Sequence, residues 1–302
     1  MPFAILARTM ELHGILIVDK PRGLTSHDVV ARLRRLLQTR KIGHAGTLDP
    51  AAEGVLILGI GRATKLLGVL SGHTKRYAAH IVIGAGSESG DIEGPLIIQP
   101  TISPPPDAAF VRQALDRFTG DIEQTPPARS AIKVGGQPLY RAARRGVSVD
   151  VPRRTVHIHR IELLDYRFPD LYLDIRCSAG TYIRSLARDI GECLGTSAYL
   201  HALVRLESGH FTLAHSWTLP ELERDLRPEM LEQFALHPAC AEAAAALVIG
   251  PNWVIPWYDG RPVATTGRST LERAYAFQID GSWAGIGMRD NEEWQPKMVI
   301  HR

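Results

Sequence analysis

The sequence predicts an α+β fold with a small, β-rich domain at its C-terminal end, and three observations support this class. Strand-like and helical patterns follow one another without the regular alternation of a doubly wound parallel sheet. Residues 248–302 contain short strand candidates separated by Gly and Asp. The chain has 302 residues, of which 45% are hydrophobic and 22% charged, which is enough for one large domain and one small one.

The first half of the chain begins with a strand pattern at residues 14–20 and a Pro-Gly loop. A helix follows to residue 37, and Thr25 and Asp28 have the spacing of a capping box. Residues 55–70 predict a buried apolar segment and then a short helix, and residues 76–86 predict a strand. An amphipathic helix is expected from 108 to 120, ending at Gly120.

The second half of the chain shows three clear patterns and one Pro-rich loop. Residues 155–166 and 171–178 predict successive strands, and residues 181–195 predict a helix closed by Gly195. The stretch from 97 to 107 predicts a surface loop. We expect a helical region to end near residues 238–250.

Composition narrows the class of protein. No run of about 18 apolar residues occurs, so we expect no membrane span, and the N-terminus lacks the pattern of a secretory signal. The three cysteines are too scattered for a disulfide framework or a zinc site, which favours a reducing cytoplasm. Residues 1–80 hold 12 Lys and Arg against 5 Asp and Glu. Such segments could form one basic face for a polyanion, or a solvated surface with chance clustering.

Asp49, in "KIGHAGTLDPAAEG", has a simple local interpretation. An Asp followed by Pro is typical of a helix N-terminus, where the carboxylate accepts free N–H groups and Pro50 fills the first helical position. On local preference alone, Asp49 is a helix cap. The rest of the chain decides whether it also performs chemistry.

Cofactor and metal patterns are weak. The glycine run from Gly84 to Gly94 has the wrong spacing for a dinucleotide loop and predicts a turn, and residues 59–65 lack the Gly-Lys-Ser/Thr of a phosphate loop. His157 and His159 would share one face of a strand, but no third ligand is evident. We therefore expect no cofactor and no metal.

Four short stretches together indicate a site for a planar base. "HAGTLDP" supplies Asp49, "KRY" supplies Tyr77, "GTYIR" supplies Tyr182 and Arg184, and "VDKP" supplies Lys20. Each residue alone has a structural interpretation as a cap, a core aromatic or a surface ion pair. Together they offer a carboxylate, a guanidinium able to hold it bidentately, and two rings that could enclose a base.

At this point the sequence resembles the TruB family of bacterial tRNA pseudouridine-55 synthases. The resemblance covers nearly the whole chain and rests on six segments in order: "GILIVDKPRGLTSHDVV", "GHAGTLDPAAEGVL", "KRYAAHIVIG", "SAIKVGGQPLYRAARRG", "CSAGTYIRSLARDIG" and "LVRLESGHF". The chain departs from the family pattern at Glu53, where Thr is usual, and in the looser acidic turn "SESGDIEG".

The resemblance implies a mixed, mainly antiparallel sheet flanked by helices. It implies a catalytic domain at 1–247, with an RNA-contacting insertion at about 124–150, and a PUA-like domain at 248–302. It also implies that uridine 55 in the tRNA T-loop is converted to pseudouridine by glycosidic cleavage, rotation of the base and carbon–carbon bond formation, without metal or redox cofactor.

The resemblance assigns roles to individual residues. Asp49 would act at C1′ or remove the C2′ proton, and a helix N-terminus would lower its pKa. Arg184 would keep Asp49 ionised, Tyr77 would stack on the uracil, Tyr182 would remove the C5 proton, and Leu203 would pack beside the base.

RNA contacts are implied in the same way. His44 would fill the space left by flipped bases, while Lys20, Lys133 and Arg144 would contact RNA. The expected partner is the T-arm of tRNA, with no membrane, no obligate protein partner, a monomeric state and a cytoplasmic location. The alternatives are an RNA-binding or RNA-folding module, the related synthase of guide-RNA complexes, and a nucleotide-dependent oxidoreductase.

Overall fold

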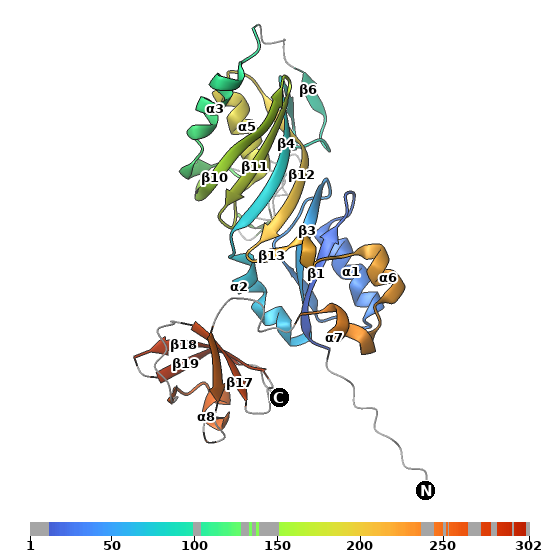
Figure 1. The fold of residues 1–302 in the computed structure, drawn as a ribbon, viewed down its shortest axis with the longest axis vertical. Coiled ribbons are helices and arrows are strands. Elements are labelled where there is room, and N and C mark those ends of the chain that lie inside the picture. Colours follow the sequence, from blue (N-terminus) through green and yellow to red (C-terminus); the bar gives the residue numbers. More distant parts are fainter. Residues whose placement is uncertain are drawn as a thin grey trace.

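The fold comes from a computed structural model, which describes residues 12–98, 104–127, 133–134, 137–138, 151–236, 245–249, 252, 254–264, 273–278, 283–291 and 293–299. A ten-stranded sheet runs through two lobes that lie one above the other, and a separate five-stranded sheet lies beside the lower lobe (Figure 1). Two pairs of neighbours in the large sheet are parallel, β1 with β14 and β12 with β3, and the other pairs are antiparallel. The predicted mixed, mainly antiparallel α+β class is confirmed.

The large sheet has the order β14-β1-β3-β12-β4-β11-β10-β7, with β13 paired to β12 and β2 to β3. Its strands are β1 (Gly14–Lys20), β2 (Ile42–Ala45), β3 (Ala52–Ile60), β4 (Lys75–Ile83), β7 (Gly120–Gln124), β10 (Arg154–Arg167), β11 (Asp170–Cys177), β12 (Ala198–Ser208), β13 (Phe211–Thr212) and β14 (Trp217–Thr218). Two small ribbons stand apart from it, β5 (Ala85–Ser87) with β6 (Leu96–Ile98), and β8 (Lys133–Val134) with β9 (Gln137–Pro138).

Helices cover the faces of this sheet. In the upper lobe α3 and α5 lie on one face, and in the lower lobe α1 and α6 lie beside β1 and β3 (Figure 1). The helices of the two lobes are α1 (Ser26–Leu36), η1 (Gly61–Leu66), α2 (Leu67–Ser71), α3 (Ala108–Asp116), α5 (Ile183–Cys193), η2 (Leu213–His215), α6 (Leu219–Asp225), η3 (Pro228–Met230) and α7 (Leu231–Phe234). The described helices include none that is long and apolar enough to cross a membrane.

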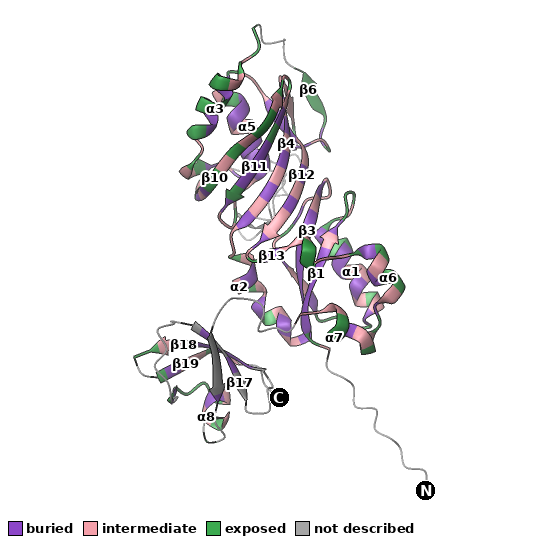
Figure 2. Ribbon diagram, in the orientation of Figure 1, coloured by how far each residue is buried: buried purple, intermediate pink, exposed green. Residues whose placement is uncertain are grey.

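The strands β1 and β3 are buried along nearly their whole length because both faces are covered (Figure 2). Leu16 and Leu56 point into the main core under α1, whereas Ile15 and Ile57 join a second cluster against η1 and α2. Successive side chains of a strand point to opposite faces, so one strand serves both clusters. This burial on both faces fixes the position of β3. The loop that carries Asp49 directly precedes this strand and is placed by it.

Two helix boundaries follow from the sequence as predicted. Thr25 caps α1, its hydroxyl accepting from the amide of Asp28 at 3.0 Å while the Asp28 carboxylate accepts from the amide of Thr25 at 2.8 Å. Gly195 follows α5 with φ +75°, a conformation that glycine adopts without strain. Helix α3 ends at Asp116, earlier than the predicted Gly120, where β7 begins.

The predicted helix after Asp49 is wrong. Residues 50 and 51 form a turn, and β3 begins at Ala52. The apolar run after Gly54 is buried on both faces as a strand, and this tertiary burial outweighs the helix-capping preference of Asp-Pro. Glu53 therefore lies in β3 and not in a helix.

The C-terminal sheet has the order β15-β17-β18-β19-β16. Its elements are β15 (Ala245–Ile249), α8 (Val254–Tyr258), β16 (Val263–Ala264), β17 (Arg273–Gln278), β18 (Trp283–Asp290) and β19 (Glu293–Val299). The helical region expected near 238–250 is thus wrong for residues 245–249, which pair in parallel with β17, and residues 237–244 lie outside the described residues. The small β-rich C-terminal part is confirmed.

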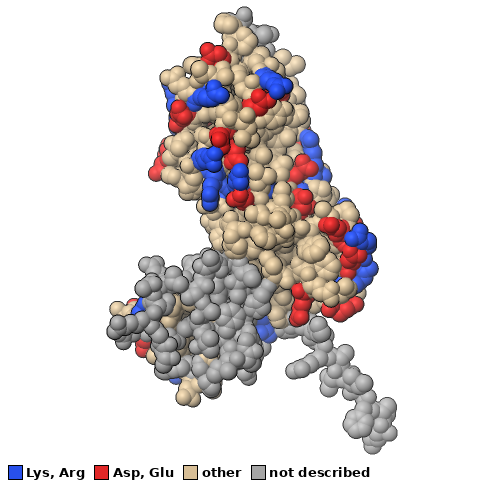
Figure 3. Space-filling model, in the orientation of Figure 1, with Lys and Arg blue, Asp and Glu red and all other residues tan. Residues whose placement is uncertain are grey.

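Charges of both signs are interspersed on the face of the molecule shown in Figure 3. Blue and red side chains alternate around the lower lobe near α6 and again on the upper lobe. This face therefore does not carry the continuous basic surface that the clustering of Lys and Arg along the sequence suggested.

Candidate active site

A cavity of about 310 Å³ opens where the two lobes meet. Four parts of the chain line most of it: residues 46–49, residues 178–184, the strand β4 and the strand β12. The structure brings five predicted residues together around this cavity, namely Asp49, Tyr77, Tyr182, Arg184 and Leu203. Its volume lies at the small end of the range for ligand pockets.

Hydrogen bonds of its main-chain groups hold the loop that carries Asp49. The hydroxyl of Ser26 accepts from the amide of Leu48 at 2.8 Å and donates to the carbonyl of the same residue at 3.1 Å. The carbonyl of Pro50 accepts from the amide of Gly23 at 2.8 Å, and the amide of Ala52 donates to the carbonyl of Asp49 at 3.0 Å. These bonds fix the loop, so the direction of the carboxylate is set before any ligand arrives.

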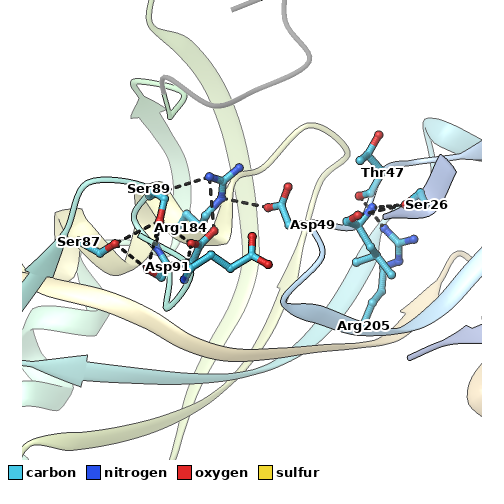
Figure 4. Close-up of polar contacts among 10 residues, drawn as sticks. Ser26, Thr47, Asp49, Ser87, Ser89, Asp91, Arg184 and Arg205 are labelled. Atoms are coloured by element: carbon cyan, nitrogen blue, oxygen red, sulfur yellow. Dashed lines mark hydrogen bonds and ion pairs between the residues drawn. The ribbon is translucent and has the colours of Figure 1, made fainter. Parts of the chain in front are cut away.

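Arg184 connects Asp49 to a buried acidic turn (Figure 4). Its Nε lies 3.0 Å from Oδ2 of Asp49, while its Nη1 donates to the carbonyl of Ser89 at 2.9 Å and lies 3.6 Å from Oδ2 of Asp91. The hydroxyl of Ser89 in turn donates to Oδ1 of Asp91 at 2.5 Å. Arg184 thus meets Asp49 through Nε and uses Nη1 for the turn.

The ion pair is asymmetric in its exposure. The side chain of Asp49 is 40% exposed, whereas those of Arg184 and Asp91 are each 6% exposed. The carboxylate is therefore the member of the network that faces the cavity. A ligand can reach Asp49, while its partners remain behind it.

Burial raises the pKa of Asp49, and the charge of Asp91 raises it further, while Arg184 and Lys20 work in the opposite direction. The expectation that a helix N-terminus lowers this pKa is wrong, because no helix begins at Pro50. The charged form of the carboxylate is stabilised by Arg184 and not by a helix dipole.

Tyr77 and Leu203 form the apolar part of the wall. They project from β4 and β12, which pair in antiparallel fashion, and both side chains are nearly buried, at 8% and 9% exposed. Burial raises the pKa of Tyr77, so its phenol stays neutral near pH 7. A flat ring and an aliphatic side chain in one wall suit the faces of a planar base.

Tyr182 is fixed by its main chain at the beginning of α5. Its amide donates to Oε1 of Gln124 at 3.0 Å, and its carbonyl accepts from Nε2 of the same side chain at 3.2 Å. The guanidinium of Arg154 lies over its ring, 5.1 Å from the centroid. The edge strand β7 therefore holds the main chain of Tyr182, and its neighbour β10 contacts the ring.

Lys20 and His44, two of the predicted RNA-contacting residues, do not line this cavity. Lys20 is fully buried, and its Nζ donates to the carbonyls of Pro21 at 2.9 Å, Leu24 at 2.6 Å and Pro50 at 3.4 Å. Its charge is thus turned toward the Asp49 loop and away from the surface, and burial lowers its pKa to about 8.

His44 lies half-buried in β2, and burial lowers its pKa. Its Nδ1 is buried and has no hydrogen-bond partner among the described residues. The main chain of Lys133 belongs to β8, but its side chain lies outside the described part of the chain, as does all of Arg144.

Sequence reasoning missed three charged residues of the site. Lys75 and Arg205 also line the cavity, and Asp91 supports Arg184. The signal for the first two was available, because Lys75 is two residues from Tyr77 and Arg205 two residues from Leu203, and residues two apart in a strand share a face. Asp91 had no such signal, since it lies in the glycine-rich turn.

The two other patterns considered from the sequence have structural explanations. The turn predicted within Gly84–Gly94 is confirmed at residues 88–89 and 92–93, while residues 85–87 pair as β5. The rings of His157 and His159 lie 4.7 Å apart, and Nδ1 of His157 is 2.7 Å from Oδ1 of Asp121. Across the described ranges, no group of three or more His, Cys, Asp or Glu could hold a metal ion.

Comparison with known families gives two adjoining matches. Residues 34–183 match the TruB family pseudouridylate synthase N-terminal domain, and residues 184–237 match the tRNA pseudouridylate synthase B C-terminal domain. The chain is 41% identical over 304 aligned residues to tRNA pseudouridine synthase B of Mycobacterium leprae, covering 95% of this chain and 91% of that protein. It is 48% identical over 259 residues to the same-named protein of Nocardia farcinica, covering 82% and 84%.

Solved structures share the fold at lower identity. A chain in the structure of an H/ACA RNP bound to a substrate RNA containing 2′-deoxyuridine aligns with a TM-score of 0.69 and 23% identity, covering 96% of this chain and 85% of that one. A chain of a Cbf5-Nop10-Gar1 complex aligns with the same TM-score and 24% identity, covering 96% and 84%. Both similarities concern the fold.

Proposed function

This chain belongs to the TruB family of pseudouridylate synthases, and on that premise we propose that it converts uridine 55 of the tRNA T-loop to pseudouridine. The relatives named tRNA pseudouridine synthase B support a tRNA substrate. The observation that carries the proposal is the accessible carboxylate of Asp49, which pairs at 3.0 Å with buried Arg184 at a cavity lined by two tyrosines and three leucines.

Asp49 is the catalytic residue in this proposal. The bond to be broken joins uracil N1 to ribose C1′ and is glycosidic, so a carboxylate beside the sugar is the expected catalyst. An ionised Asp49 serves either of two routes, attack on C1′ or removal of the C2′ proton. Arg184 holds the carboxylate in place and favours its charged form.

The wall residues handle the base. Tyr77 stacks on the uracil while it is detached, and its neutral phenol suits a stacking surface better than a proton acceptor. Leu203 packs beside the base, and Tyr182, which lines the same cavity, removes the C5 proton in the last step. The new bond joins C5 to C1′, so the proton lost from C5 is balanced by one gained at N1.

Access to a stacked uridine requires base flipping, which costs a few kcal/mol of unstacking energy. His44 lies in β2 ahead of the Asp49 loop, and we assign it to the space that the flipped bases leave. Lys133 and Arg144 contact phosphates, which position RNA without reading bases. Buried Lys20 acts on the RNA indirectly, through the carbonyl of Pro50 in the loop.

The proposal includes the cellular setting. The protein acts as a monomer on the T-arm of tRNA in the cytoplasm, without an obligate protein partner. Recognition rests on the folded shape of the T-loop, because RNA is read mainly through unstacked loops and backbone geometry.

The test uses unmodified tRNA transcript, purified wild-type protein and the Asp49→Ala and Asp49→Asn variants, with pseudouridine mapped by carbodiimide labelling and primer extension. We expect a stop at uridine 55 with wild type alone and unchanged tRNA binding by both variants. A stop at another uridine would overturn the assignment of position 55. Binding by all three proteins without any modification would support an RNA-binding module.

A further inference from the structure

Arg205 is the most deeply buried charge of the site. Its side chain is 1% exposed, and it projects from β12 where this strand lies between β3 and β4. No carboxylate among the described residues forms an ion pair with it, and the nearby charges that its own charge affects are those of Lys20, His44 and Lys75. A buried cation without a counter-ion is costly unless polar groups surround it, so its other contacts must explain its place.

Those contacts are carbonyl oxygens of β3 and of the loop that precedes it. Nε of Arg205 donates to the carbonyl of Val55 at 2.6 Å, and Nη2 donates to that of Gly46 at 3.1 Å. Nη1 makes a longer contact of 3.5 Å with the carbonyl of Thr47. Gly46 and Thr47 begin the short loop that ends at Asp49, and Arg205 approaches this loop in Figure 4.

A second contact joins Arg205 to the wall of the cavity. In the pairing of β12 with β4, Arg205 lies directly opposite Tyr77. Directly opposite residues of two paired strands are close neighbours on one face of the sheet, and the charge of Arg205 acts on the phenol of Tyr77. Arg205 therefore links the loop that carries the carboxylate to the strand position that holds the ring facing the base.

The main chain of Arg205 lies unusually close to the neighbouring strand β3. Gly54 of β3 lies opposite Arg205 with φ +101°, and a side chain there would collide with the main chain of Arg205. Gly46 also has a positive φ, of +94°, and a Cβ there would meet Nη1 at 3.6 Å. That distance is an ordinary contact, so it is Gly54 that permits the close approach of β3 and β12.

We infer that Arg205 is a positioning residue, which fixes the Asp49 loop relative to Tyr77 so that the carboxylate and the base meet in one geometry. The inference rests on the proposed function, since it assigns Arg205 a part in the same reaction. Arg205 does not need to touch the substrate for this purpose. A displacement of about 1 Å between reacting groups costs about 100-fold in rate.

The contacts demand an arginine. The guanidinium sends its donors in fixed directions, to the carbonyl of Val55 in β3 and to the carbonyls of Gly46 and Thr47 in the loop, whereas an ammonium is a compact group that cannot span these acceptors. Lysine would keep the charge and most of the apolar stem. Arg205→Lys therefore separates geometry from charge, and Arg205→Met removes both.

The experiment compares wild type, Arg205→Lys and Arg205→Met with Arg176→Lys, a control at an exposed arginine of β11. Single-turnover formation of pseudouridine at saturating enzyme gives the rate, and filter binding gives tRNA affinity. Amide hydrogen exchange across residues 42–52 reports on the loop without relying on activity. Thermal unfolding checks that each variant is folded at the assay temperature.

We expect Arg205→Lys to lower the single-turnover rate about 100-fold while the Kd for tRNA stays within about threefold of wild type. Loop amides should exchange faster in both Arg205 variants, and the control should match wild type in every measurement. An unchanged rate in folded Arg205→Lys would overturn the inference, as would unchanged loop exchange.

A loss of tRNA affinity equal to the loss of rate would also overturn it, because Arg205 would then act in binding. Failure of the proposed function looks different. Wild type would produce no pseudouridine, and the exchange measurement would still decide whether Arg205 holds the loop.

Discussion

The charge state of Asp49 depends on a balance between burial and three neighbours. Burial and Asp91 raise its pKa, while Arg184 and Lys20 lower it. Either catalytic route requires the ionised carboxylate, so activity should fall as pH drops through this pKa, which lies above the ordinary value of 3.8. The fall in rate at low pH, called the acid limb below, therefore reports on the Asp49–Arg184–Asp91 network.

Asp91→Asn should move this acid limb to lower pH. Replacing the carboxylate by an amide removes a negative charge that raises the pKa of Asp49, so the pKa falls. The measurement is the single-turnover rate from pH 4.5 to 8. Ser89→Ala is the control, because it removes a hydrogen bond to Asp91 but retains its charge. A shift of the limb to higher pH would show that Asp91 does not act through its charge.

Lys75 should make stability depend on pH in the alkaline range. Its Nζ donates to the carbonyls of Ser71 at 2.6 Å and His73 at 2.5 Å, and burial lowers its pKa from 10.5 to about 8. Between these values the unfolded chain binds more protons at this site than the folded protein does. The free energy of unfolding contributed by Lys75 therefore rises with pH between about 8 and 10.5.

Lys75→Met removes this contribution. Relative to the variant, wild type should gain on the order of 2 kcal/mol of unfolding free energy between pH 8 and 10.5, measured by urea titration at several pH values. Parallel curves for the two proteins would mean that the pKa of Lys75 is close to its unfolded value.

At the scale of elements, the close approach of β3 and β12 depends on Gly54. Its φ of +101° strains any other residue, and a Cβ would also collide with the main chain of Arg205. We expect Gly54→Ala to lower the unfolding free energy by at least about 2 kcal/mol. Gly23→Ala is a matched control, because Gly23 has φ +89° but nothing within 4 Å of a Cβ, and it should cost about 1 kcal/mol. Equal losses in the two variants would argue against the collision.

Local patterns predicted elements whose ends are determined locally. The capping box at Thr25 and the glycine after α5 are satisfied by neighbouring residues, and both predictions are confirmed. Asp49-Pro50 shows the opposite case. The pattern there is also typical of a helix start, but β3 is selected by pairing with β1 and β12, and no window around Asp49 contains that information.

The residues of the candidate site also fall into two groups, those that the sequence identified and those that only the fold reveals. Asp49, Tyr77, Tyr182, Arg184 and Leu203 were identified through resemblance, and the fold gathers all five around one cavity. Spacing from Tyr77 and Leu203 could have indicated Lys75 and Arg205 one at a time. That the two lie at one cavity could not be predicted, because β4 and β12 are far apart along the sequence. The buried position of Lys20 was equally hidden, since an exposed and a buried lysine look alike before the fold is known.

At the scale of the whole molecule, the C-terminal sheet packs against the lower lobe. Ile286 of β18 is 4% exposed and belongs to the same apolar cluster as Ile17 and Phe211. Nζ of Lys65 also donates to the carbonyl of Val299 at 2.7 Å. Apolar burial is the stronger of these two contacts, because an exposed hydrogen bond contributes little net free energy.

Ile286→Asp should therefore separate the unfolding of the two sheets. Calorimetry of wild type should show one transition, and the variant should show two, because a carboxylate in this cluster is unfavourable. Lys65→Ala, which removes only the hydrogen bond, should retain one transition. Two transitions already in wild type would show that the cluster does not couple the sheets.

The place of β4 in the sheet has a consequence for the synthesis of the protein on the ribosome. β4 lies between β11 and β12, yet β4 ends at residue 83, while β11 begins at residue 170 and β12 at residue 198. Throughout the synthesis of the residues between β4 and β11, both edges of β4 lack a partner strand. The wall that holds Tyr77 is completed only when β12 has emerged, so we expect newly made protein to depend on protection of β4 during translation.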